Sequence, residues 1–264
     1  MTTQMLFYDN IAAVTKEQHG DLALKPLGDY SFTKNVNAVP LLTSEFLSAA
    51  SEFPIVFVGT KEQMLPHAII GTRQQENLFV NEEGAWQGKY VPAFIRRYPF
   101  VFSSANDGQT LTLCIDESYP GFNREGHGER LFDSEGNQTL YLNNVLEFLR
   151  GYQLSFQATT QFCSKLQELE LLTKMQAKVT SGSGETNQLS GFLGVDRQKL
   201  RGLADDAVLE LHKSGGLDAL HAHLLSMQTF PLIADRIQSA AEVPDVGNAQ
   251  NDISGLPVEE SQAE

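Results

Sequence analysis

The sequence predicts an α+β protein, in which a mainly antiparallel β-rich first portion packs against a helical second portion. Short runs of β-branched and aromatic residues, separated by turn-forming residues, recur up to residue 116. From Leu142 onward the apolar residues follow helical spacing instead. With 264 residues, 41% of them hydrophobic, the chain can bury a real core. We therefore expect a β-rich portion over residues 1–138, a helical portion over 139–241 and a disordered acidic tail over 242–264.

The strands of the first portion are expected in five short runs. The clearest is FPIVFVGT, residues 53–60, and the others are residues 67–71, 77–81, 100–104 and 111–116. A short helix is expected to begin at Pro92 and to place Arg96 and Arg97 at its end, just before the strand over 100–104. Residues 117–138, rich in glycine, are expected to form a loop or a lid.

The second portion is expected to be mainly helical. Apolar positions at Leu142, Leu149 and Leu166 follow helical spacing, and residues 180–188 have the composition of a flexible connector before one short strand over 190–195. Asp196 is a suitable N-cap for a helix that ends at Gly215 and Gly216. Helices over residues 217–227 and 230–241 follow, and the tail has too few large apolar groups to offset the entropy of ordering it.

Composition excludes several classes of function. The formal net charge is −14, from 33 acidic and 19 basic residues, and an acidic chain is a poor partner for nucleic acid. The sequence contains no apolar run long enough for a transmembrane segment and no recognisable signal peptide at its start. The two cysteines, Cys114 and Cys163, match no disulfide or zinc pattern, so we expect reduced, buried thiols and a cytoplasmic protein.

Four arginines form the first candidate site. Arg96, Arg97, Arg124 and Arg130 would make an anion or carboxylate site if the loop over 117–138 folds across the strand that starts at Phe100.

The alternative for these arginines is a structural role, in which they pair with Asp116, Glu117, Glu125 and Glu129. Because neighbours on an extended chain point to opposite faces, Arg96 and Arg97 are expected to have different roles. One would pair with a carboxylate of the loop, and the other would be free to meet an acidic partner or a peptide carboxylate.

A metal site is the second candidate. His127 and Glu129 form a His-x-Glu pair that, with His223 and the later Arg236, has the spacing of the iron-binding triad of 2-oxoglutarate oxygenases. That site requires strands, whereas His223 falls in an expected helix, where His221 and His223 point to nearly opposite faces. We therefore expect no bound metal and no cofactor, and keep this oxygenase as the alternative function.

Four landmarks carry a family resemblance: RRYPFVF from Arg96, GERLFDSEGNQT from Gly128, GFLGVDRQKLRGL from Gly191 and GGLDALHAHLLSM from Gly215. Together they resemble the SapC family of bacterial proteins, over roughly residues 20–238. The resemblance implies an accessory protein of Gram-negative bacteria linked by name to the surface layer, and it brings no catalytic residues. It favours a non-enzymatic binding protein with a protein or peptide partner.

Overall fold

The computed structural model describes residues 5–104, 111–180, 184 and 186–241, and it confirms the predicted α+β class. In this part of the chain the strands form three antiparallel sheets. The largest has the order β10-β11-β4-β5-β3, and the other two have the orders β1-β7-β6 and β8-β2-β9. The expected tail over 242–264 lies outside the described residues.

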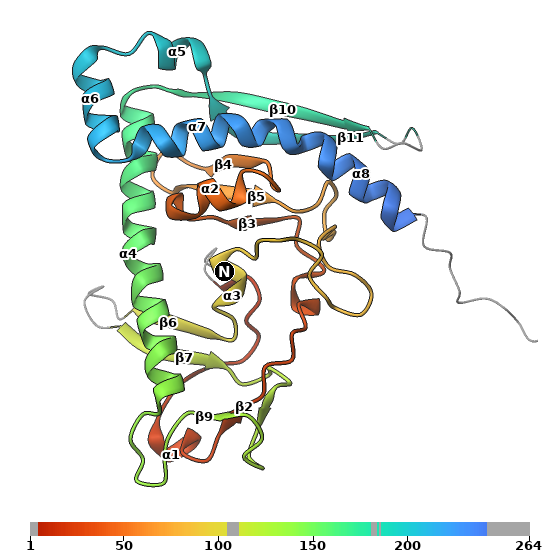
Figure 1. The fold of residues 1–264 in the computed structure, drawn as a ribbon, viewed down its shortest axis with the longest axis vertical. Coiled ribbons are helices and arrows are strands. Elements are labelled where there is room, and N and C mark those ends of the chain that lie inside the picture. Colours follow the sequence, from red (N-terminus) through yellow and green to blue (C-terminus); the bar gives the residue numbers. More distant parts are fainter. Residues whose placement is uncertain (1–4, 105–110, 181–183, 185, 242–264) are drawn as a thin grey trace, which may run out of the picture.

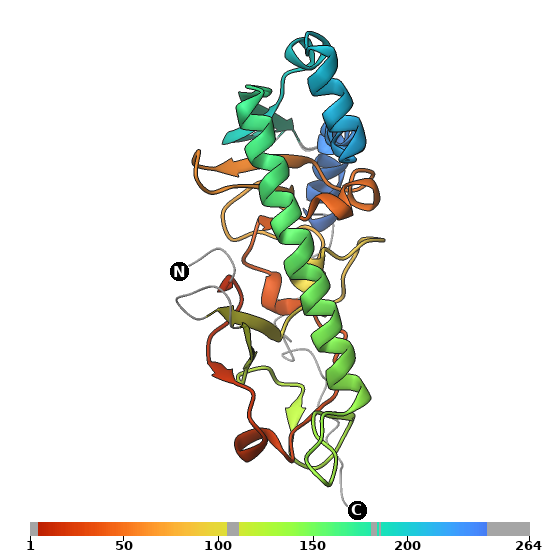
Figure 2. The same cartoon turned by 90° about the vertical axis from the view of Figure 1, so that its left-hand side faces the viewer.

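The sheets are stacked along one long helix, α4 (Leu140–Glu168) (Figure 1). Thr139 caps its start by accepting a hydrogen bond from the Leu142 amide at 3.3 Å. At about 1.5 Å per residue its 29 residues span about 43 Å, which lets one helix contact all three levels of the molecule. Figure 2 shows α4 in front, running from the sheet of β9 to the level of α6.

The five-stranded sheet lies at the C-terminal end of α4. It contains the hairpin of β4 (Ile55–Gly59) and β5 (Met64–Ile69), flanked by β3 (Ala38–Pro40) on one side. On the other side it carries β11 (Thr186–Val195) and β10 (Leu172–Thr180). The short helix α2 (Phe46–Ala49) and the helix α7 (Gly216–Ser226) pack against this sheet, and α8 (Phe230–Ala241) crosses toward β10 (Figure 1).

The middle sheet pairs β1 (Ile11–Ala13) with β7 (Leu111–Asp116) and β7 with β6 (Phe100–Ser104). The third sheet places β2 (Ala23–Leu24) between β8 (Phe122–Asn123) and β9 (Glu129–Arg130), beside α1 (Lys16–His19). The glycine-rich segment over 117–138 is therefore not only a loop, because it supplies β8 and β9.

Most expected elements are present, including the short helix α3 (Ala93–Arg96), whose N-cap is Pro92. The prediction of a strand over residues 77–81 is wrong. Residues there form an irregular segment with a single bridge, Val80 to Trp86. The side chain of Asn77 accepts from the Phe79 amide at 2.9 Å and donates to the Thr33 hydroxyl at 2.8 Å, and such local bonds compete with a strand ladder.

The hairpin of β10 and β11 is the main departure from the expected helical second portion. Helical spacing ends at Glu170, whose φ of 51° stops α4, and the alternating pattern of LTKMQAKVT then forms β10. The expected strand over 190–195 is the second half of the longer β11. The single helix expected after Asp196 is divided into α5 (Arg197–Arg201) and α6 (Asp205–Lys213) around Gly202.

His223 of α7 joins the hairpin to the rest of the sheet. Its ring is fully buried; Nδ1–H donates to the Ile55 carbonyl at 2.8 Å, and Nε2 accepts from the Val195 amide at 3.0 Å. The Ser226 hydroxyl accepts from the Ile55 amide at 3.0 Å. Side chains of α7 thus bind β4 and β11, two strands paired directly only at Leu193 and Phe57.

Candidate functional site

An aromatic cleft of about 490 Å³ lies between residues 24–32, the turn from α3 into β6, and the first half of α4. This volume is in the range of small-ligand sites. Seven aromatic side chains line it: Tyr30, Phe32, Tyr98, Phe100, Tyr119, Tyr141 and Phe148. All of them except Phe100 are partly exposed, so the walls present ring faces and edges to the opening.

The rings on one side of the aromatic cleft are arranged at defined angles. Phe32 stacks on Tyr98 with ring centres 4.3 Å apart, and Tyr119 stands at 86° to Tyr98 at 5.5 Å. Stacked and perpendicular pairs of this kind are the favoured aromatic geometries and hold each ring in place. Aromatic contacts therefore set the positions of these rings in the cleft wall.

Arg96 and Arg97 both border the cleft, but they do not lie on the extended chain from which their different roles were predicted: Arg96 ends α3 and Arg97 is its helical C-cap. Arg97 is only 3% exposed and lies over the rings of Phe94 and Tyr152, with its Cζ atom 4.3 and 4.9 Å from their centres. Arg96 is exposed; its Nε–H donates to the Val91 carbonyl at 2.9 Å, and its guanidinium lies 5.4 Å from the centre of the Phe148 ring. Arg97 belongs to the core, and Arg96 presents its charge at the cleft.

This difference predicts unequal effects on stability. We expect Arg97→Ala to lower the free energy of unfolding by about 2 kcal/mol or more, because it removes a buried cation–aromatic contact and the packing of its stem. Arg96→Ala should change it by less than about 1 kcal/mol, since that side chain is exposed. Urea unfolding of both variants at pH 7 measures the difference, and equal losses would contradict these assignments.

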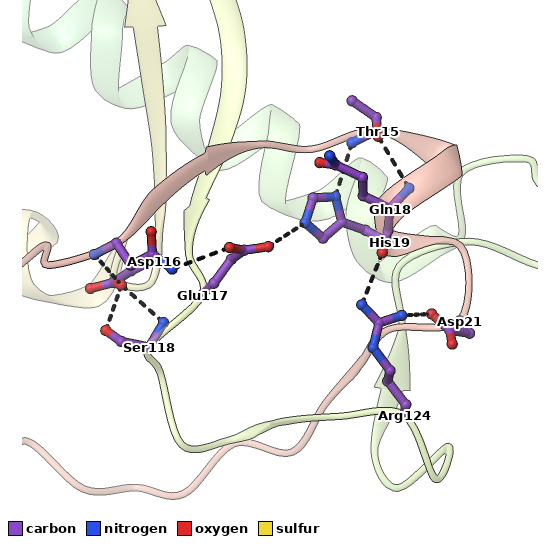
Figure 3. A network of polar contacts seen from close by, with 9 residues as sticks. Thr15, Gln18, His19, Asp21, Asp116, Glu117, Ser118 and Arg124 are labelled. Carbon is purple, nitrogen blue, oxygen red and sulfur yellow. Dashed lines mark hydrogen bonds and ion pairs between the residues drawn. The ribbon is translucent and has the colours of Figure 1, made fainter.

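Arg124 and Arg130 do not join Arg96 and Arg97, so the four arginines do not form one anion site. Arg124 pairs with Asp21 and donates to the Gln18 carbonyl at 3.0 Å, which anchors the β8 region to α1 (Figure 3). Arg130 lies exposed on β9, opposite Ala23 of β2. Neither residue lines the aromatic cleft.

A polar network surrounds Asp116 (Figure 3). Asp116 is fully buried, and its carboxylate accepts from the amides of Asp9 and Asn10, both at 3.0 Å. It also accepts from the amide of Ser118 at 3.1 Å and from its hydroxyl at 2.6 Å. Burial alone would raise the pKa of Asp116, but the hydrogen bonds from Ser118, Asp9 and Asn10 outweigh it and lower the pKa.

The next residue, Glu117, binds His19 rather than an arginine. His19 is 1% exposed; its Nδ1 accepts from the Thr15 amide at 3.1 Å, so its Nε2–H is the donor toward Glu117 Oε1 at 3.2 Å (Figure 3). Glu117 Oε2 accepts from the Asn10 side chain at 3.2 Å. The predicted pairing of Asp116 and Glu117 with arginines is therefore replaced by these contacts.

The network supports the cleft directly through Tyr98, whose hydroxyl donates to Asp116 Oδ2 at 3.2 Å. Ser118, which also donates to Asp116, directly precedes Tyr119 of the cleft wall. From the sequence, Asp116 was expected only as a partner of an arginine, and His19 was not singled out for this site. The available signal was an acidic pair directly after the apolar strand LTLC, together with the spacing of Thr15 and His19.

The alternative metal site is not formed. His127 and Glu129 are exposed beside β8 and β9, whereas His223 is buried in α7 at the opposite end of α4 (Figure 1). Both ring nitrogens of His223 already have backbone partners. Across the described residues, no group of three or more His, Cys, Asp and Glu side chains could hold a metal ion.

Fold and site define an α+β protein built along one long helix, with an aromatic cleft supported by a buried polar network. The SapC family model matches residues 14–232, so the chain belongs to the SapC family, as the resemblance predicted. A comparison with curated proteins gave no match, and a comparison with solved structures gave none either. Within the described residues, every helix is too short or too polar to cross a membrane.

Proposed function

We propose that this SapC-family chain is a non-catalytic accessory protein that captures a segment of a protein or peptide in the aromatic cleft. The observation that carries the proposal is the combination of an aromatic wall with the exposed guanidinium of Arg96. Aromatic rings bind apolar side chains and proline rings, and a guanidinium binds a carboxylate in bidentate fashion. We propose further, on the family resemblance, that this capture serves the handling of surface-layer or outer-membrane proteins.

The chemistry of the cleft favours binding over catalysis. Burial raises the pKa of the Tyr98 and Tyr119 hydroxyls, and it raises that of Tyr141 to about 12. These groups are neutral hydrogen-bond donors at physiological pH rather than bases. His19 has both ring nitrogens engaged and lies behind the wall, where it holds the chain rather than meeting a ligand.

Two buried thiols suit capture inside the cytoplasm, before a partner is exported. Cys114 and Cys163 are both free and buried, and burial raises the pKa of Cys163 to about 12, so it stays a thiol. A reducing compartment is where such cysteines are usual.

A cleft-filling variant tests the proposal. Asn144 is exposed on α4 and lines the cleft, so Asn144→Trp would place an indole in its opening; Asn143→Trp, on the same helix outside the lining, is the matched control. Each protein is used to select from a random dodecapeptide library displayed on phage. We expect the wild type and Asn143→Trp to enrich the same sequences, and Asn144→Trp to lose them.

The selection can also reject the proposal. Failure of the wild-type protein to enrich any family of peptides would overturn it. Equal enrichment by Asn144→Trp would show that peptides bind elsewhere on the molecule.

A further inference from the structure

We propose that the ligand of the aromatic cleft is an extended segment with a proline or aromatic core, bordered by an acidic residue at Arg96 and a basic residue at Asp29. This inference rests on the proposed function and adds the chemistry of the ligand. Arg96 and Asp29 both line the cleft, on separate elements, with the aromatic rings as the rest of its wall. Three independent features of the cleft support the proposal.

The first feature is the orientation of Arg96. Its Nε–H is fixed on the Val91 carbonyl, and its guanidinium lies 5.9 and 5.4 Å from the ring centres of Tyr90 and Phe148. Within the described residues no carboxylate lies at ion-pair distance from it. An exposed guanidinium that is held in position and has no carboxylate partner is suited to a carboxylate of a ligand.

The second feature is Asp29, which supplies the opposite charge. Its Oδ1 accepts from the Ser31 amide at 2.8 Å, and hydrogen bonds from Ser31 lower its pKa, so the carboxylate is ionised at neutral pH. Gly84 packs directly against this carboxylate, since a Cβ atom added at Gly84 would lie 2.0 Å from Oδ1 of Asp29. In the described part of the chain Asp29 has no lysine or arginine at ion-pair distance, which leaves it open to a basic residue of a ligand.

The third feature is the set of hydrogen-bond donors among the rings. The hydroxyls of Tyr30 and Tyr141 have no hydrogen-bond partner among the described residues, although both side chains are partly buried. A segment in the polyproline II conformation makes no internal hydrogen bonds, so its carbonyls need donors of this kind. Aromatic grooves that bind such segments combine ring faces with hydroxyl donors in the same way.

The experiment pairs charge removal on the protein with charge removal on the peptide. The probe is a fluorescein-labelled peptide with blocked ends and the sequence lysine–proline–tyrosine–proline–glutamate, followed by fluorescence anisotropy. In the wild type, replacing the peptide's glutamate with glutamine should weaken binding about three- to fivefold. In Arg96→Gln the same replacement should change the affinity by less than about twofold, because its partner is already absent.

Asp29 is tested in the same way at the other end of the peptide. Replacing the peptide's lysine with glutamine should weaken binding to the wild type about three- to fivefold and leave binding to Asp29→Asn nearly unchanged. Arg124→Gln is the control, since that exposed arginine lies outside the cleft, and it should bind all peptides as the wild type does. Thermal melting confirms that each variant is folded.

The outcomes separate this inference from the proposed function. The inference would be overturned if replacing the peptide's glutamate or lysine left its affinity for the wild type unchanged. It would also be overturned if each replacement weakened binding to the wild type and to the variants equally. Either result would leave the proposed function standing. Binding of no peptide from this set, together with no enrichment from the dodecapeptide library, would overturn both.

Discussion

Asp116→Ala is expected to lower the free energy of unfolding by about 3 to 5 kcal/mol at pH 7. The substitution removes a fully buried carboxylate and leaves the amides of Asp9, Asn10 and Ser118 without the group that accepts from them. It also releases the Tyr98 hydroxyl, so the wall of the aromatic cleft loses its support. Urea unfolding measures the loss, and peptide binding to the folded variant should weaken as well.

An exposed acidic residue of the same region provides the control. Asp21→Ala removes the partner of Arg124, and since both side chains are 56% exposed, the loss should be below about 1 kcal/mol. A loss of similar size in Asp21→Ala and Asp116→Ala would refute the assigned role of Asp116. Since the folded protein lowers the pKa of Asp116, the contribution of this residue is present above about pH 4 and is lost as the pH falls further.

His223 is expected to make stability depend on pH in a separate window. Desolvation lowers its pKa from 6.5 to about 4 in the folded protein, with a smaller contribution from the charge of Arg197. Between these values the unfolded chain binds a proton that the folded chain does not. The free energy of unfolding therefore holds its full value, with respect to this group, above pH 6.5. As the pH falls toward 4, it decreases by about 3 kcal/mol.

His223→Gln isolates this effect. We expect the variant to be less stable than the wild type at pH 7 by about 1 to 3 kcal/mol, since glutamine cannot keep both backbone contacts of the ring. The difference in the free energy of unfolding between wild type and variant should decrease toward pH 4, because the wild type loses stability as His223 is protonated whereas glutamine does not titrate. His221→Gln, exposed on the same helix, should follow the wild type throughout. Parallel curves for His223→Gln and the wild type in urea unfolding from pH 7 to 4 would exclude this role.

The fold could be predicted where the hydrophobic period is local and strong. Runs such as FPIVFVGT and the stripe along α4 carry their own signal, so β4 and the long helix were predicted at their observed places. The hairpin of β10 and β11 was not, because helical spacing continues up to Glu170 and the alternation of β11 is broken by a bulge between Leu189 and Phe192. A bulge moves the alternating pattern by one residue and weakens the signal of a strand.

The candidate site was predicted only in part, for a different physical reason. Different surroundings were expected for Arg96 and Arg97 on the assumption of an extended chain, whereas both residues have helical conformation at the end of α3. The aromatic cleft, by contrast, collects rings from residues 30–32, 98–100, 119 and 141–148, which no local pattern connects. Asp116 was expected only as a partner of an arginine, and His19 was missed, because most of their partners are backbone amides and side chains distant in sequence.

The pairing of β4 with β11 has a consequence for the nascent chain. β4 is synthesised early, but its second neighbour in the sheet comes only after the whole of α4 and β10 have been made. Until then the strand edge that carries Ile55 and Phe57 is open, and open apolar edges pair readily with other chains. During translation this edge of β4 therefore stays unpaired until β11 has been synthesised. Covering it depends on the last third of the protein, where His223 and Ser226 of α7 form hydrogen bonds to Ile55 of the same strand.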